Sequence, residues 1–152
     1  MRYEQLTHAG KMKTLKRMHR FINKHFFNNS LRVIPLDIEN ISKEEDLSGL
    51  FGVCDIPGFP YPEKISISHE LEKDIEKMKT QKEQVLLLGT ILLHEAIHQY
   101  CYENGIEDEN HAGQWKETAK EHGLISIYED GTLIEEHLTT TAYITMQSFR
   151  IV

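Results

Sequence analysis

The sequence predicts an α+β fold, in which a short three-stranded sheet packs on an N-terminal helix and a central helix and is followed by a C-terminal hairpin. Apolar residues recur at helical spacing from about Thr7 to Phe27, and a long apolar run fills Gln81 to Asn104. Between these helices lie short segments rich in Val, Ile, Leu and Phe, which are typical of strands. With 152 residues, of which 39% are hydrophobic, the chain fits a single domain, residues 1–152, built around one core.

The elements of the first half are bounded by residues that start or stop helices and strands. The N-terminal helix is amphipathic, and we expect it to end near Asn28-Asn29. Ser68 can cap a short helix that continues to about Lys79, because acidic residues fill its first turn and basic residues its last. Pro, Gly and acidic clusters separate three expected strands, Leu31–Ile38, Leu47–Asp55 and Lys64–Ser68.

The second half begins with the central helix. Thr80 and Glu83 form a capping box before it, and Asn104-Gly105 supplies a stop. Its first half is apolar nearly all round, which predicts a buried position. We expect three further segments, namely a polar loop at Ile106–Asn110, a second helix from about Ala112 to His122 ended by Gly123, and a hairpin around Asp130-Gly131 within Leu124–Val152.

Composition favours a soluble cytoplasmic protein without membrane association. No apolar stretch approaches the roughly 20 residues of a membrane span, and the basic N-terminal segment lacks the apolar run of a secretory signal. Cys54 and Cys101 are far apart and form no CxxC pair. Neither a disulfide framework nor a cysteine-based zinc ribbon is therefore expected, and two thiols fit a reducing compartment.

The central helix carries the pattern His94-Glu95-Ala96-Ile97-His98, an HExxH motif. Four residues advance a helix by about one turn, so both imidazoles leave the same face and can reach one zinc ion. Glu95 projects beside them and could move a proton between an activated water and a leaving amine. Titratable residues inside such an apolar run would be costly if they were unpaired. The motif therefore predicts metal-assisted hydrolysis of amide bonds, with one Zn²⁺ as the cofactor.

A catalytic zinc site usually takes three protein ligands and leaves one position open, so a third ligand must come from elsewhere. We favour His111, which follows the polar turn at the mouth of the expected second helix, where the helix dipole favours a neutral imidazole. His122 lies too far along that helix to join His111 at one ion. The alternatives are two carboxylates of the same helix and two distant histidines: Glu117, Glu121, His69 and His137.

The surrounding residues resemble the SprT-like, or Spartan-like, zinc metallopeptidases, in the short form found in bacterial and phage genomes. The resemblance rests on Leu92–Tyr100, Asn104-Gly105, His111 with Trp115-Lys116, and Glu121–Leu124. The expected order of elements upstream, a helix, three strands and a helix, is also similar to that of the family. It covers about residues 10–125 and leaves 126–152 as a hairpin extension. The longer metzincin pattern is not met, because Cys101 and Asn104 occupy the places of its Gly and third His.

The resemblance implies a minigluzincin-type zincin domain that binds zinc through His94, His98 and His111 and uses Glu95 as general acid and base. Protein or peptide substrates are implied, cleaved with low sequence specificity and either unfolded or DNA-associated. The chain lacks the Cys-rich ribbon of larger members, which weakens any inference of crosslink repair. The alternative is a catalytically inactive protein in which zinc clamps two helices and stabilises a surface that binds a partner or nucleic acid.

Partners and substrate contacts are less constrained by the sequence. Residues 1–32 carry a net charge of +7, from eight Lys and Arg against one Glu, whereas the whole chain carries −7. Phosphates of DNA could be bound by a basic helix face formed by Lys11, Lys13, Lys16, Arg17, Arg20 and Lys24, with His8, His19 and His25 nearby. An extended peptide could pair with a strand edge at Lys64–Ser68 or Leu50–Asp55. Tyr100, Tyr102 and Tyr128 are candidates to stabilise an oxyanion.

Overall fold

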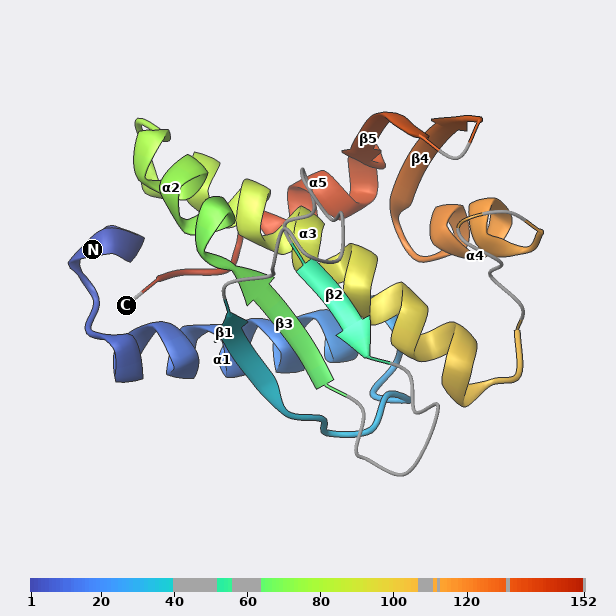
Figure 1. The fold of residues 1–152 in the computed structure, drawn as a ribbon, viewed down its shortest axis with the longest axis horizontal. Helices are drawn as coiled ribbons and strands as arrows, with labels where there is room; N and C mark the ends of the chain where they lie inside the picture. Colours follow the sequence, from blue (N-terminus) through green and yellow to red (C-terminus); the bar gives the residue numbers. More distant parts are fainter. Residues whose placement is uncertain (40–51, 56–63, 107–110, 112, 131, 152) are drawn as a thin grey trace.

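The computed structural model describes residues 1–39, 52–55, 64–106, 111, 113–130 and 132–151, and its fold is α+β, as predicted (Figure 1). This part of the chain contains five α-helices, a short 3-10 helix at Tyr3–Gln5, a three-stranded sheet and a two-stranded hairpin. The helices are α1 His8–Phe26, α2 His69–Lys77, α3 Gln81–Glu103, α4 Trp115–Glu121 and α5 Thr140–Met146. The strands are β1 Leu36–Glu39, β2 Gly52–Asp55, β3 Lys64–Ser68, β4 Leu124–Glu129 and β5 Thr132–Leu138.

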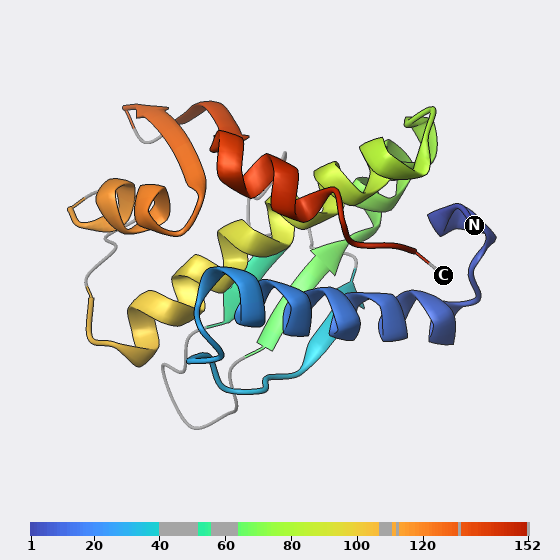
Figure 2. The same cartoon turned by 180° about the vertical axis from the view of Figure 1, so that it is seen from behind.

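The three-stranded sheet has the order β1-β3-β2 and covers α1 and α3 on one side (Figures 1 and 2). Strand β1 pairs parallel with β3, and β2 pairs antiparallel with its other side. The prediction that Lys64–Ser68 offers an edge to a peptide is therefore wrong, because both sides of β3 are already hydrogen-bonded. Strand β2, at Gly52–Asp55, lies at the edge of the sheet, and residues 47–51 of that expected strand lie outside the described residues.

The first strand begins later than predicted, at Leu36 and not at Leu31. The backbone of Leu31 is held by the Asn23 side chain, whose Oδ1 accepts from Leu31 N at 2.9 Å and whose Nδ2 donates to Leu31 O at 3.0 Å. Arg32 N donates to Glu103 at 3.2 Å. These side-chain partners replace the ladder bonds of a strand. The sheet begins only at Pro35, whose carbonyl accepts from Ile65 N at 3.0 Å.

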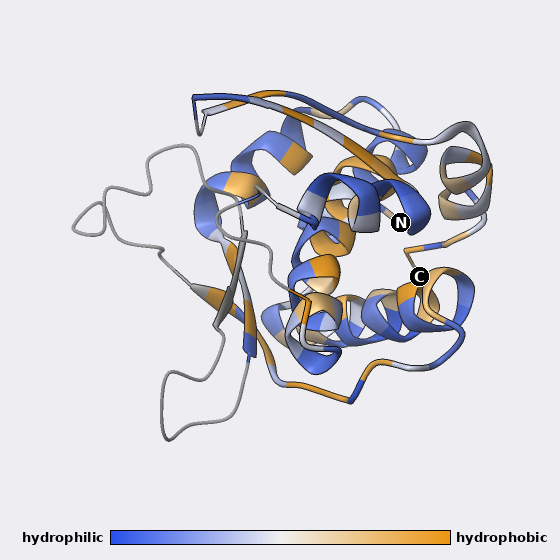
Figure 3. Ribbon diagram, turned by 90° about the vertical axis from the view of Figure 1, so that its right-hand side faces the viewer, coloured by the Kyte–Doolittle hydropathy of each residue, from blue (hydrophilic) through white to orange (hydrophobic). Residues whose placement is uncertain are grey.

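Helix α3 passes through the centre of the hydrophobic core. Thr80 caps it by accepting from Glu83 N at 3.1 Å, and Leu88, Leu92, Leu93 and Ala96 are fully buried. In Figure 3, the orange segments, which mark hydrophobic residues, are frequent in the central helices. No helix in the described part of the chain is both long and apolar enough to span a bilayer.

Gln81, at the start of α3, holds both ends of the described chain. Its Nε2 donates to Met1 O at 2.6 Å, and its Oε1 accepts from Ile151 N at 3.2 Å. Accordingly, the two termini lie close together in all three views (Figures 1, 2 and 3).

The C-terminal half departs from the predictions at two places. Helix α4 begins at Trp115, whereas we expected it to begin near Ala112, which lies outside the described residues together with 107–110 of the expected loop. The predicted hairpin is confirmed as β4 and β5, but the segment 126–152 is more than a hairpin, because Thr139 caps the additional helix α5. The buried residues Ala142 and Met146 hold α5 against the core.

Two helix-ending glycines test this packing, since both have a positive φ but only one is crowded. At Gly123, with φ +98°, an added Cβ would lie 2.8 Å from the Cβ of Ala142, whereas at Gly105, with φ +65°, it would meet nothing within 4 Å. We expect Gly123→Ala to lower the free energy of unfolding by about 2–4 kcal/mol, through backbone strain and overpacking. Gly105→Ala should lower it by about 1–2 kcal/mol. Equal losses for the two variants in urea unfolding would contradict the role given to α5.

Candidate metal centre

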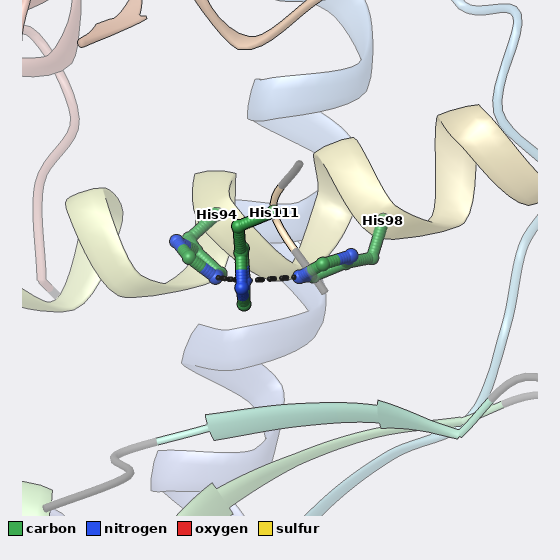
Figure 4. Close-up of side chains that lie close together, drawn as sticks. All are labelled: His94, His98 and His111. Carbon is green, nitrogen blue, oxygen red and sulfur yellow. Dashed lines mark hydrogen bonds between the residues drawn. The ribbon is translucent and has the colours of Figure 1, made fainter. Parts of the chain in front are cut away.

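Helix α3 presents His94 and His98 on one face, as the spacing predicted. Their ring centroids lie 5.1 Å apart, and both rings point toward the same space beside the helix (Figure 4). His94 is 7% exposed and His98 is half-buried. Burial of two imidazoles in a helix that is otherwise apolar requires polar partners.

His111 completes the group from the segment that follows α3. Its Nε2 lies 3.0 Å from the Nε2 of His94 and 3.0 Å from the Nε2 of His98 (Figure 4). One nitrogen from each ring lies within 4.8 Å of the other two, so the three residues could hold a metal ion. Among the described residues, this is the one such group of His, Cys, Asp and Glu side chains.

His111 reaches this position by a different route from the one we expected. It precedes the first residue of α4, Trp115, by four positions, and its φ is +70°. The expected help from the dipole of α4 is therefore wrong, because the helix does not begin beside His111. A left-handed backbone, which histidine adopts more readily than most residues, turns the ring toward α3 instead.

The other candidate ligands lie elsewhere. Glu117 and Glu121 are exposed on α4, and the ring of His122 stacks on Phe27 with centroids 4.6 Å apart. His69 Nδ1 lies 2.9 Å from Glu72, and His137 Nδ1 lies 3.3 Å from Glu135.

The chemistry of the three rings fits a metal ion. His94 Nδ1 donates to Glu136 Oε2 at 2.6 Å, so the neutral ring of His94 carries a lone pair on Nε2. The Nε2 of His111 faces this lone pair and His98 Nε2 at the same distance of 3.0 Å, and a single N–H can satisfy only one of them. A cation accepts all three lone pairs at once. Two nitrogens bound at about 2.0–2.1 Å to a tetrahedral ion lie roughly 3.3 Å apart, close to the 3.0 Å that separates His111 Nε2 from each of the other two Nε2 atoms.

Glu136 is a residue of the site that the sequence motif did not identify. It lies on β5, and its side chain is 7% exposed. Ser126 Oγ on β4 donates to the same Oε2 at 2.7 Å, and the ladder places Ser126 directly opposite Glu136. The alternation of β5 could have suggested an inward-facing carboxylate, but nothing in the sequence links it to His94.

Trp115 forms a platform beneath the three imidazoles. It is fully buried, its ring stacks on His98 at 4.3 Å, and its centroid lies 4.9 Å from His94 and 4.8 Å from His111. Among the described residues, its Nε1 has no hydrogen-bond partner. A rigid aromatic contact with every ring of the group limits how far each can turn.

Glu95 lies beside the group without belonging to it. Its side chain is 6% exposed, and its Oε2 is 4.0 Å from His94 Nε2. This carboxylate is near enough to exchange a proton with a group placed among the imidazoles, directly or through one water. The geometry fits the role of general base better than that of a ligand.

Tyr128 is the candidate tyrosine that lies at the group. Its ring stacks on His111 with centroids 4.4 Å apart and an angle of 11°. Burial, together with the charges of Glu136 and Glu95, raises the pKa of its hydroxyl, so the phenol stays protonated and can donate. Tyr100 instead packs on Phe27 and His122, and Tyr102 is 41% exposed beside Glu103 and Asn104.

Trp115 is the single tryptophan of the chain, so its fluorescence reports on this site. We expect Zn²⁺ or Co²⁺ to change the emission with a stoichiometry of about one ion per chain. His111→Ala should weaken binding by more than the roughly 10–100-fold typical of losing a residue that supports a ligand. His137→Ala, at an exposed histidine, is the matched control and should leave the titration unchanged. Equal affinities for the two variants would remove His111 from the site.

Comparison of the chain with protein-family models, curated proteins and solved structures finds no match.

Proposed function

We propose that this protein is a zinc-dependent metallopeptidase. The observation that carries the proposal is that three imidazole nitrogens lie close together, two from α3 and one from the segment that follows it. The Glu95 carboxylate lies 4.0 Å from His94 Nε2. Three histidines with one open position are a common ligand set of catalytic zinc.

The chain supplies the parts that such a reaction needs. A zinc ion held by His94, His98 and His111 would lower the pKa of a bound water to about 7 and would polarise a carbonyl. Glu95 takes the proton of the attacking water and delivers it to the leaving amine nitrogen. The protonated Tyr128 hydroxyl, close to Glu95 and Glu136, is a candidate donor to the oxyanion.

The resemblance to SprT-like peptidases belongs to this proposal. It assigns His94, His98 and His111 as ligands and Glu95 as the general base, and it implies a minigluzincin-type domain. The order of a helix, a small sheet, a helix and the HExxH helix agrees with that domain. Helix α5 lies outside residues 10–125, the segment that carries the resemblance.

The substrate we propose is an extended segment of an unfolded or DNA-associated protein. Strand β2 is an edge of the sheet and packs against α3, the helix that carries the HExxH motif. Main-chain pairing to this edge recognises backbone and not particular side chains, which suits low sequence specificity.

Glu95→Gln separates metal binding from catalysis. The amide keeps the size of the side chain and leaves the three imidazoles in place, but it cannot carry the proton. We expect an unchanged zinc content and at least about 100-fold slower cleavage of unfolded casein. Glu117→Gln, at an exposed carboxylate of α4, should cleave like the wild type. Undiminished cleavage by Glu95→Gln would contradict the mechanism.

The competing proposal is a catalytically inactive protein in which zinc clamps α3 to the segment before α4. Full zinc occupancy of the wild type without turnover of any unfolded substrate would favour this clamp. Cleavage by the wild type that a chelator abolishes and added zinc restores would exclude it.

A stripe of cations on α1 favours nucleic acid as an additional partner. At about 100° per residue, five of the expected basic residues fall within roughly 100° of arc, namely Lys13, Lys16, Arg17, Arg20 and Lys24. Lys11 does not belong to the stripe, since it lies 3.3 Å from Glu72. His19 is only 5% exposed, and its Nε2 donates to Gln99. We therefore leave Lys11 and His19 out of the proposed DNA-contacting face.

The stripe borders a basic groove of about 420 Å³ between α1 and the C-terminal segment. Arg17, Arg20, Lys24 and Arg150 line it, and Arg17 donates to Arg150 O at 3.0 Å. Within the described chain, no carboxylate forms an ion pair with Lys13, Lys16, Arg20 or Lys24. Like charges three and four residues apart destabilise a helix, and bound phosphates would relieve this repulsion.

Charge reversal tests this contact. We expect Lys13→Glu, Lys16→Glu, Arg20→Glu and Lys24→Glu together to abolish binding of a labelled DNA duplex at low salt. Each lost phosphate contact should lower the slope of log affinity against log salt by about 0.9. The control reverses four exposed lysines on and after α2, namely Lys73, Lys77, Lys79 and Lys82, with the same change in net charge. Equal losses would assign the effect to net charge and not to the stripe.

A further inference from the structure

We propose that the β4-β5 hairpin is part of the metal centre, with Glu136 as the positioning residue of His94 and Tyr128 as the positioning residue of His111. The inference rests on the proposed metal site but not on the peptidase activity. It concerns residues beyond the segment that resembles a known family.

Glu136 determines which nitrogen of His94 faces the other imidazoles. The 2.6 Å bond from Nδ1 joins two side chains that are 9% and 7% exposed, so little water competes with it. It places the proton on Nδ1 and leaves Nε2 as the donor to a metal ion. The negative charge also makes the ring a stronger ligand.

The position of Glu136 is itself fixed by the hairpin. Ser126 lies opposite it in the ladder and donates to the same oxygen at 2.7 Å. On the other face of β5, Glu135 and His137 have side chains that are 59% and 48% exposed. The alternation of the strand therefore turns one glutamate toward the imidazoles and its neighbour toward solvent.

Tyr128 packs on His111, the one proposed ligand that lies outside the α-helices and strands. His111 lies outside any α-helix or strand and has a positive φ, so its backbone alone gives little hold on the ring. Tyr128 stacks on one side of this ring at 4.4 Å and 11°, and Trp115 meets it edge-on at 4.8 Å and 87°. A register shift between Ile127 and Tyr128 marks a bulge, a feature that re-aims side chains.

The helix α5 anchors the hairpin to the rest of the molecule. Thr139 N donates to Gly123 O at 2.9 Å, which joins the two ends of the hairpin, and Met146 is fully buried against the core. The hairpin is thus held at its base on the same body that carries α3, and its inner face meets two of the three imidazoles.

Zinc affinity of the full chain, measured by competition with a chromophoric chelator, tests the inference without any peptide substrate. We expect Glu136→Ala to weaken zinc binding by about 10–100-fold and Glu136→Gln by less, because an amide oxygen still accepts from Nδ1. Glu135→Ala, its neighbour on the exposed face, is the matched control and should bind like the wild type. Tyr128→Phe should keep the affinity because it keeps the stack, whereas Tyr128→Ala should lose it.

The absorption spectrum of bound Co²⁺ provides a second measurement, since it reports ligand geometry. We expect a changed spectrum for Glu136→Ala and Tyr128→Ala and a wild-type spectrum for Glu135→Ala and Tyr128→Phe. If Glu136→Ala does not fold, Glu136→Gln and Ser126→Ala carry the test, with a smaller loss of affinity expected for each.

The outcomes distinguish this inference from the proposed function. Wild-type zinc affinity and an unaltered Co²⁺ spectrum in Glu136→Ala and Tyr128→Ala would overturn it, as would a wild-type chain that binds no zinc. A wild type that binds zinc but cleaves nothing would refute the peptidase and leave the positioning roles intact.

Discussion

Helix α3 lies in the middle of an apolar core and yet carries His94, Glu95, His98 and Gln99 along it. Each polar side chain in such a place needs a partner, because an unpaired buried dipole or charge costs more than its neighbours can offset. The partners come from distant parts of the chain. Gln99 accepts from His19 on α1 and donates to Arg32 O at 2.8 Å, while Glu136 accepts from His94. Burial of the His19 ring also lowers its pKa, which keeps it neutral as a donor. One helix thereby dictates where three other segments must lie, namely α1, the segment at Arg32 and β5.

Much of this arrangement follows from local rules. The side-chain cap at Thr80 and the stop at Gly105 bound α3 as predicted, since a cap depends on residues within one turn. The meeting of His94 and His98 follows from helix geometry alone. His111 was favoured because it follows the polar turn at the mouth of the expected second helix, and the structure brings its Nε2 to 3.0 Å from both rings, although α4 begins only at Trp115.

Other features depend on contacts between residues far apart in sequence, which no local pattern records. The segment after Leu31 has the composition of a strand, but Asn23 and Glu103 hold its backbone. Trp115 contacts all three imidazoles, and no sequence pattern around it indicates these contacts. Glu136 is one of two acids on β5, and only the packing of the hairpin on α3 distinguishes it from Glu135. The helix α5 was missed because its run of Thr, Tyr and Ile favours strands over helices.

The residues of the candidate metal centre and its proposed supports are spread along the chain from His94 to Glu136. A polypeptide emerging from the ribosome therefore gains them one at a time: two imidazoles with α3, the third with the next segment, and the carboxylate brace last. Until β5 has been synthesised, Nδ1 of His94 has no acidic partner to set its tautomer. In the proposed metal site, the order of synthesis would therefore leave His94 without its carboxylate partner until the hairpin is complete.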